Sequence, residues 1–199
     1  LQNKKNLGII YGIGEHERDR YHVNQVYPVM FSDDYVQKDD VFISIRNLSM
    51  VILYRPSENK IIWQSVGPWV NQHDARYLGD GKISVFGNNI VRGLDQQFEF
   101  LLGHSEVYIY DISNNTYSLP FSKVMKNSKQ RSGGIFKLLD NGDGFSEFSS
   151  DMIVKRFNEE EIIWEYVHYL GNSKKGNLNW TRYLDESDVN LESLNNICK

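Results

Sequence analysis

Short runs of strand-forming residues, separated by turn residues, recur along most of this 199-residue chain. The turns include Gly79-Asp80-Gly81, Ser113-Asn114-Asn115 and the stretch 140–144. Short strands at a spacing of about 8–12 residues predict an all-β sandwich, barrel or propeller. The runs lie at 41–46, 50–55, 60–66, 75–78, 82–86, 106–112, 116–121, 134–139, 145–148, 152–157 and 161–167.

Composition favours the same fold class. The chain holds a single alanine, Ala75, against 19 asparagines, 12 tyrosines, 10 phenylalanines and 4 tryptophans. Alanine is the strongest helix former, aromatic residues favour strands, and asparagine favours turns. We therefore expect an all-β protein with many tight turns.

Internal repetition distinguishes among the all-β architectures. The Ile-Ile-Trp segment at 60–66 is echoed at 161–167, so that Trp63 and Trp164 lie 101 residues apart, about twice the length of a four-stranded propeller blade. The chain divides into units of about 50 residues, at 22–66, 72–123 and 131–168. Each unit predicts four antiparallel strands, a propeller blade. A sandwich with a chance repeat is the alternative that the residues leave open.

Three blades do not close a ring, so residues 1–168 predict a partial propeller, or half of a six-bladed one. Its two terminal sheets would expose faces that another blade normally covers. We expect further blades from the parent chain or from a second copy. Residues 1–21 are expected to finish a preceding blade. Residues 169–199 are polar and rich in asparagine, and predict an extension that packs on or closes the propeller, with a short helix near 187–194.

Charge and motifs exclude several classes of function. The net charge is −4 and no basic block occurs, which argues against nucleic acid or an anionic membrane as partner. No apolar run approaches the about 18 residues of a membrane span. The only cysteine, Cys198, excludes an intrachain disulfide and a four-cysteine zinc site. The charged run around His16 predicts a solvated loop, and the stretch 140–144 predicts a hairpin turn that lacks the ligand spacing of a calcium loop. No metal and no cofactor are expected.

Two of the five histidines occupy equivalent positions. His22 and His73 each precede the first strand of a unit, and they lie 51 residues apart, about one blade. Equivalent positions in neighbouring blades face the same central channel, and Arg46 ends the next strand of the first unit. Two imidazoles and a guanidinium form a site for a tetrahedral anion, because arginine offers a planar donor fork and histidine can donate or attack. Isolated hydrogen-bonded turn histidines remain the alternative.

Several motifs resemble the arylsulfotransferase (ASST-like) family of β-propellers. The resemblance rests on His22-Val23-Asn24, the stretch 40–48, Lys60-Ile61-Ile62-Trp63, Gln72-His73-Asp74, and Phe86-Gly87-Asn88-Asn89, and it covers roughly 20–185. The characterised enzymes of that family are six-bladed and usually exported, so the resemblance implies a periplasmic or extracellular location.

The resemblance also implies an activity. These enzymes move a sulfo group from a phenolic sulfate ester to a phenol without a nucleotide donor. During transfer the group is covalently bound to a histidine. For this chain the resemblance implies that His73 is the nucleophile, His22 the supporting histidine and Arg46 the sulfate-binding arginine. A small aryl sulfate or phenol is the expected ligand, with Asn24, Gln72, Asp74 and Trp69 expected near it. The alternative is a non-catalytic propeller that binds a ligand or a protein partner at the channel mouth.

Overall fold

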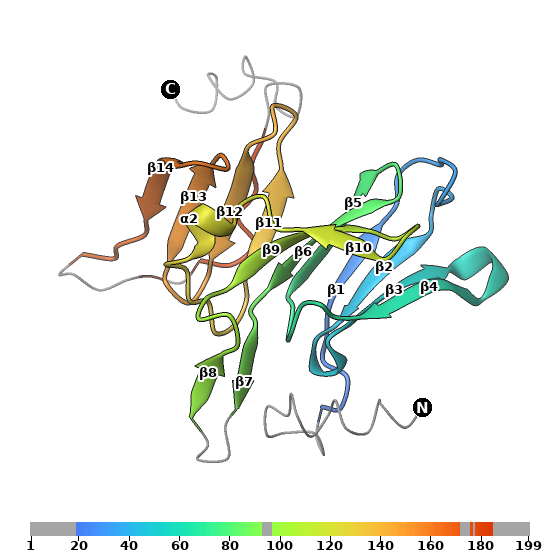
Figure 1. The fold of residues 1–199 in the computed structure, drawn as a ribbon, viewed down its shortest axis with the longest axis horizontal. Coiled ribbons are helices and arrows are strands. Elements are labelled where there is room, and N and C mark those ends of the chain that lie inside the picture. The colour runs from blue at the N-terminus through green and yellow to red at the C-terminus, as the bar shows by residue number, and fades with distance from the viewer. Residues whose placement is uncertain (1–18, 93–96, 172–175, 177, 185–199) are drawn as a thin grey trace.

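Three four-stranded antiparallel sheets follow one another along the chain and stand side by side (Figure 1). The computed structural model describes residues 19–92, 97–171, 176 and 178–184. In each sheet the strands run outward in chain order from an innermost first strand, as in a propeller blade. The predicted all-β class, built of four-stranded antiparallel blades, is confirmed.

The first blade is a meander of β1 (Val23–Pro28), β2 (Val41–Ile45), β3 (Met50–Arg55) and β4 (Lys60–Val66). One-turn 3₁₀ helices connect β2 to β3 (Arg46–Leu48) and β3 to β4 (Pro56–Glu58). Each ends in a residue in the left-handed region, Ser49 with φ 48° and Asn59 with φ 50°. Asparagine tolerates this conformation better than most residues, which explains its place in a turn.

The second blade contains β5 (Asp74–Gly79), β6 (Lys82–Gly87), β9 (Glu106–Asp111) and β10 (Thr116–Ser118). Asp80 and Gly81 join β5 to β6 with φ values of 49° and 69°, the positive pair that a two-residue hairpin turn requires. A hairpin of β7 (Ile90–Arg92) and β8 (Phe98–Phe100) interrupts the blade between β6 and β9. The sequence did not predict this hairpin, nor the short helix α2 (Ser122–Met125) that follows the end of β10.

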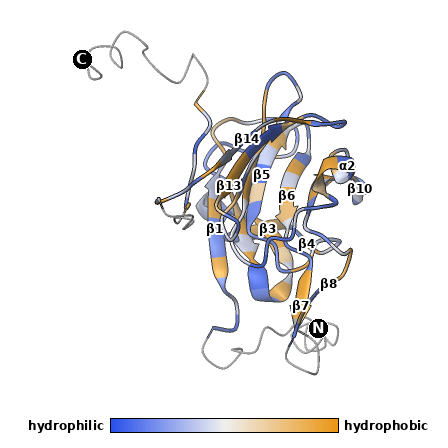
Figure 2. Ribbon diagram, turned by 90° about the vertical axis from the view of Figure 1, so that its left-hand side faces the viewer, coloured by the Kyte–Doolittle hydropathy of each residue, from blue (hydrophilic) through white to orange (hydrophobic). Residues whose placement is uncertain are grey.

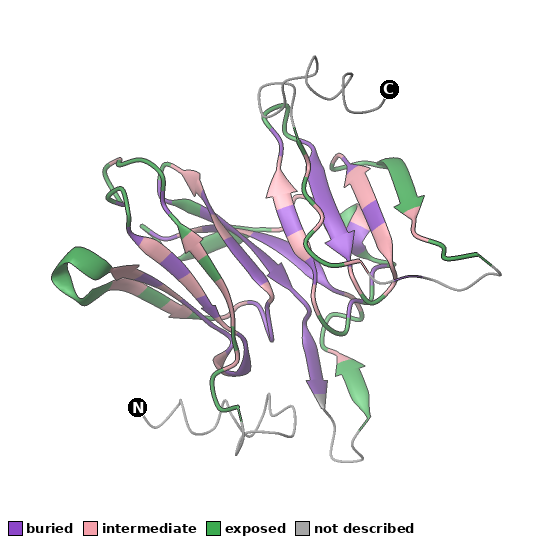
Figure 3. Ribbon diagram, turned by 180° about the vertical axis from the view of Figure 1, so that it is seen from behind, coloured by how far each residue is buried: buried purple, intermediate pink, exposed green. Residues whose placement is uncertain are grey.

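The third blade is again a meander, of β11 (Ile135–Leu138), β12 (Gly144–Phe148), β13 (Ile153–Phe157) and β14 (Ile162–Val167). The innermost strands β1, β5 and β11 contact one another in turn. Burial is greatest in the middle of the molecule: all of β12 and nearly all of β6 are buried, whereas the outermost strand β14 is mostly exposed (Figure 3).

Two apolar clusters hold neighbouring blades together. Phe42 and Leu53 of the first blade meet Ile83 and Val85 of the second, and Trp69 is buried between them. The second blade meets the third through rings that are almost fully buried, those of Phe86, Phe121, Phe136, Phe148 and Phe157. Apolar residues therefore lie in the strands, and the connecting loops are mostly hydrophilic (Figure 2).

The outward faces of the first and third blades carry exposed apolar side chains. Strand alternation turns Val26 away from the cluster that holds Tyr27, and Val26 is 57% exposed. On the third blade, Trp164 and Tyr166 are 39% and 52% exposed. A closed propeller covers such faces with another blade, so the described residues form an open arc.

The segment 178–184 lies against the third blade, where Leu178 and Tyr183 pack on a small cluster of Leu139, Phe145 and Val154. The expected preceding blade and the helix near 187–194 fall largely or wholly outside the described residues, so the proposed limits of the propeller and its extension stay predictions. No helix in the described part of the chain has the length and apolar character needed to span a membrane.

Candidate active site at the start of the innermost strands

Hairpin register brings His22 and Arg46 together. His22 directly precedes β1 and Arg46 directly follows β2, and the antiparallel pair places Val23 opposite Ile45. The backbone N–H of Arg46 donates to the carbonyl of His22 at 3.0 Å. His22 itself has φ 49°, which turns the chain into the strand. The two side chains are therefore fixed at one end of the first blade.

The second blade places His73 and Asn88 in the same two positions. His73 precedes β5, Asn88 follows β6, and the backbone N–H of His73 donates to the carbonyl of Phe86 at 3.1 Å. In the third blade these positions hold Gly134 and Ser149, which carry no imidazole or guanidinium. The histidines thus come from two neighbouring blades, as their spacing predicted.

The two imidazoles meet edge to face at the blade junction. Their ring centroids are 6.4 Å apart, with the planes inclined at 68°. His22 Nδ1 lies 2.6 Å from Asp19 Oδ2, and the His22 backbone N–H donates to Asp19 Oδ1 at 2.8 Å. These bonds with His22 lower the pKa of the Asp19 carboxyl. Ionised Asp19 therefore orients His22, with the proton on Nδ1 and the Nε2 atom free to exchange a proton.

Asn88 selects the tautomer of His73. Asn88 is fully buried, and its Nδ2 donates to the carbonyls of Gln130 and Gly133 at 2.9 and 3.0 Å. Those two acceptors fix the amide so that Oδ1 faces His73 Nδ1, at 2.7 Å. Because Oδ1 can only accept, the assigned network puts a proton on Nδ1 and leaves the lone pair on Nε2.

His73 is neutral near pH 7. Burial, followed by the positive charge of Arg46, lowers its pKa from 6.5 to about 4. A neutral imidazole with a free Nε2 lone pair can act as a nucleophile or as a base.

Arg46 supplies a buried positive charge beside the imidazoles. It is 8% exposed, and its Nη1 donates to Asn47 Oδ1 at 3.0 Å. Its Nε has no hydrogen-bond partner among the described residues. Burial lowers the pKa of the guanidinium, and the charge of Asp19 opposes this effect. An arginine remains protonated at neutral pH, so Arg46 keeps a positive charge beside the imidazoles, while its unpaired Nε–H is covered by protein atoms.

The other predicted residues divide into two groups. Asn24 lines a cavity with His73, donates to the carbonyl of Gln72 at 2.7 Å, and has a buried Oδ1 without a partner among the described residues. Gln72 is fully buried and its Nε2 bonds Ser44 Oγ and the carbonyl of Met50. Trp69 is also fully buried, in the core. The structure therefore brings Asn24 to His73, and places Gln72 and Trp69 inside the blades.

Asp74 links all three blades. Its buried carboxylate accepts from the Phe136 N–H of β11 at 2.7 Å, from Arg76 Nε of β5 at 2.8 Å, and from the Gln25 amide of β1. Its partners are all protein groups, so the carboxylate holds the backbone next to His73 in place. This structural role explains why an aspartate directly follows His73 in the sequence.

The His73 cavity has a volume of about 200 Å³. It lies between the starts of β1, β5 and β11 and is closed on one side by Asn179 and Trp180. Glu147 lines it too, but its oxygens accept from the Ser149 hydroxyl at 2.5 Å and from the Thr181 N–H at 2.6 Å. No group of three or more metal-ligating side chains occurs in the part of the chain that the structure describes.

Sequence reasoning missed Asp19, Asn88 and Glu147 as members of this site. Asp19 belongs to a charged run that predicted a solvated loop, although it lies three residues before His22. Asn88 stood in one of the motifs that carried the resemblance, and its position after the second strand of its blade matches that of Arg46. A comparison of blade positions would have found Asn88.

Comparison with known proteins shows the family of the chain. No curated protein matches the chain. The family model described as arylsulfotransferase (ASST) matches residues 1–169, which include all three blades and the residues His22, Arg46 and His73. The match covers most of the 199 residues, and the chain therefore belongs to the arylsulfotransferase (ASST) family.

Proposed function

We propose that this chain transfers a sulfo group from an aryl sulfate ester to a phenol, with His73 as the nucleophile. The observation that carries the proposal is the Asn88 bond, which leaves the neutral His73 ring with its lone pair on Nε2. Membership of the arylsulfotransferase family supports the reaction class.

In the first step, His73 Nε2 attacks the sulfur of the ester. A bond forms between nitrogen and sulfur, the bond between sulfur and the aryl oxygen breaks, and the phenolate leaves. The ring keeps its Nδ1 proton and carries a positive charge, which Asn88 Oδ1 stabilises by accepting from Nδ1. In the second step an acceptor phenol gives up its proton, its oxygen attacks the sulfur, and neutral His73 leaves.

Arg46 and His22 assist both steps in this proposal. The positive charge of Arg46 beside His73 stabilises the negative charge that builds up on the sulfuryl oxygens in the transition state. His22, oriented by Asp19 and carrying a second proton on Nε2 at the start of the cycle, gives that proton to the leaving phenolate and takes one back from the acceptor phenol.

Intact-mass spectrometry after incubation with phenyl sulfate tests the proposal. The sample is kept mildly alkaline, because sulfohistidine loses its sulfo group in acid. We expect one added sulfo group that peptide mapping assigns to His73, absent from His73→Ala and strongly reduced in Arg46→Ala. Full labelling of folded His73→Ala would show that the nucleophile is another residue. Folded wild-type protein without an adduct would favour a non-catalytic ligand-binding propeller.

A further inference from the structure

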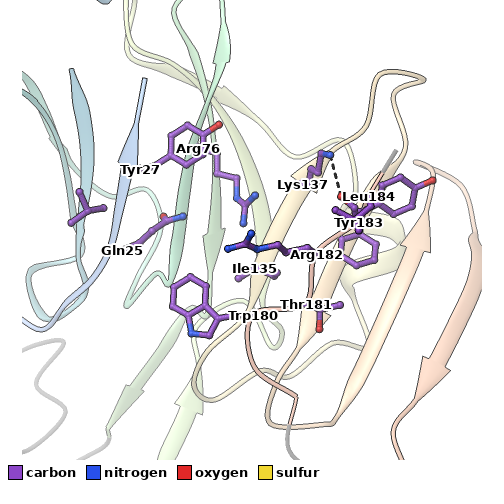
Figure 4. Close-up of a pocket in the computed structure, with 12 residues that line it drawn as sticks. Gln25, Tyr27, Arg76, Ile135, Lys137, Trp180, Thr181, Arg182, Tyr183 and Leu184 are labelled. Carbon is purple, nitrogen blue, oxygen red and sulfur yellow. Dashed lines mark hydrogen bonds between the residues drawn. The ribbon is translucent and has the colours of Figure 1, made fainter. Parts of the chain in front are cut away.

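A second, larger cavity adjoins the His73 cavity. It has a volume of about 520 Å³ and lies between β1, β5, β11 and the segment 180–184 (Figure 4). Ile135 and Trp180 line both cavities, so the two are neighbours. Small-molecule sites typically occupy about 300–1,000 Å³, a range that the His73 cavity of about 200 Å³ does not reach. The larger cavity has room for the part of a substrate that does not react.

Positive charge dominates this second cavity, which we call the cationic cavity. Arg76, Lys137 and Arg182 line it, and no acidic side chain belongs to its described lining. The Nε of Arg76 donates to Asp74, which balances the Arg76 charge, and Lys137 Nζ donates to the carbonyl of Tyr183 at 3.4 Å. Arg182 has no hydrogen bond or ion pair with any described residue. The Arg182 guanidinium therefore has its charge and its N–H donors available to a bound anion.

Contacts with the third blade fix the segment 180–184, which carries Arg182. The Thr181 N–H donates to Glu147, the Tyr183 ring packs on Phe145 at 5.3 Å, and the Tyr183 hydroxyl accepts from Arg156 at 3.3 Å. Thr181 and Tyr183 thus hold the segment to the third blade. The alternate residues Trp180 and Arg182 point the other way, into the cavity, where the Arg182 side chain faces Arg76 (Figure 4). The chain bends at Trp180, which has φ 64°, before it continues to Arg182.

We propose that the cationic cavity binds a carboxylate on an aromatic substrate whose phenolic oxygen lies in the His73 cavity. Guanidinium groups match the planar geometry of a carboxylate, and Trp180, on the wall between the cavities, packs against the aromatic ring. The substrate class is then a phenol, or its sulfate ester, with an acidic side chain. The assignment of the phenolic end rests on the proposed function, whereas the binding of the carboxylate does not.

Isothermal titration with no sulfo donor present tests the carboxylate site alone. The probes are para-hydroxyphenylpropionate and its primary amide, which differ in the negative charge. We expect the carboxylate to bind at least about tenfold more tightly than the amide. Arg182→Gln should remove this preference, and Arg182→Lys should restore part of it. Lys60→Gln removes one charge from the outermost strand of the first blade and should change nothing.

Two outcomes overturn the proposal: equal affinity of wild-type protein for both probes, or a preference that survives Arg182→Gln. The titration is repeated on His73→Ala, which should keep the preference, because binding needs no sulfo transfer. A carboxylate preference in a protein that forms no sulfohistidine would uphold the cationic cavity and reject the transfer reaction. Sulfohistidine formation without a carboxylate preference would uphold the transfer reaction and reject the carboxylate site.

Discussion

Protonation of His73 is expected to destabilise the folded protein in acid. In the unfolded chain a histidine titrates near 6.5, whereas burial and the charge of Arg46 lower the pKa of folded His73 to about 4. Between these values the unfolded state binds more protons than the folded state, so the free energy of unfolding falls as the pH falls. Each pH unit between the two pKa values lowers the free energy of unfolding by about 1.4 kcal/mol. Protonation of His73 alone therefore lowers it by about 3 kcal/mol between pH 7 and pH 4.

Urea unfolding, followed by tryptophan fluorescence from pH 7 to pH 4, measures this loss. Other groups titrate in the same range, so the comparison is with His73→Gln, which keeps an N–H for Asn88 and cannot be protonated. We expect the free energy of unfolding of the wild type to fall by about 3 kcal/mol more than that of His73→Gln. His168→Gln removes a histidine of the third blade as a control and should follow the wild type. Parallel losses in wild type and His73→Gln would refute the assignment of His73 as a buried neutral imidazole.

Three further substitutions test the site and its support. Asn88→Ala frees His73 Nδ1, so the rate of His73 sulfation should fall by about tenfold or more. Nitrogen NMR of the imidazole should then show a mixture of tautomers, and an unchanged tautomer would contradict the role of Asn88. Asp74→Ala leaves buried donors unpaired and should lower the free energy of unfolding by about 3–5 kcal/mol in urea, and a loss below about 1 kcal/mol would contradict the link between blades. Gly134→Ala should lower the melting temperature clearly, because a Cβ there would overlap the Phe86 ring and φ is 102°; an unchanged melting temperature would show that the two blades can separate slightly.

The blade pattern could be predicted from local sequence because local chemistry determines it. The strands at 50–55 and 60–66 have the predicted bounds, and the turn at Asp80-Gly81 has the backbone angles that its residues favour. The spacing of His22 and His73 then predicted their meeting, because equivalent positions of adjacent blades share one end of the channel. The structure brings them within 6.4 Å.

The rest depends on contacts that local sequence does not encode. The hairpin of β7 and β8 has only three residues in each strand, too few for a period to be recognised. Trp69 and Gln72 flank the predicted site in sequence, but burial is a property of the packed blades, and both lie in the interior. Hairpin register brings Asn88 to His73, and the docking of segment 178–184 brings Arg182 to the cationic cavity.

The Asp74 carboxylate has a consequence for how the molecule opens. One buried group is bonded to three innermost strands, so detaching any blade from the arc breaks one of its bonds. The opening of one blade is thereby coupled to the others, and also to the peptide of His73, the preceding residue. The amide of Phe136, which donates to Asp74, should exchange its hydrogen only in openings as costly as global unfolding. The blades would then melt as one cooperative unit, and heat would inactivate the protein at the temperature at which it unfolds.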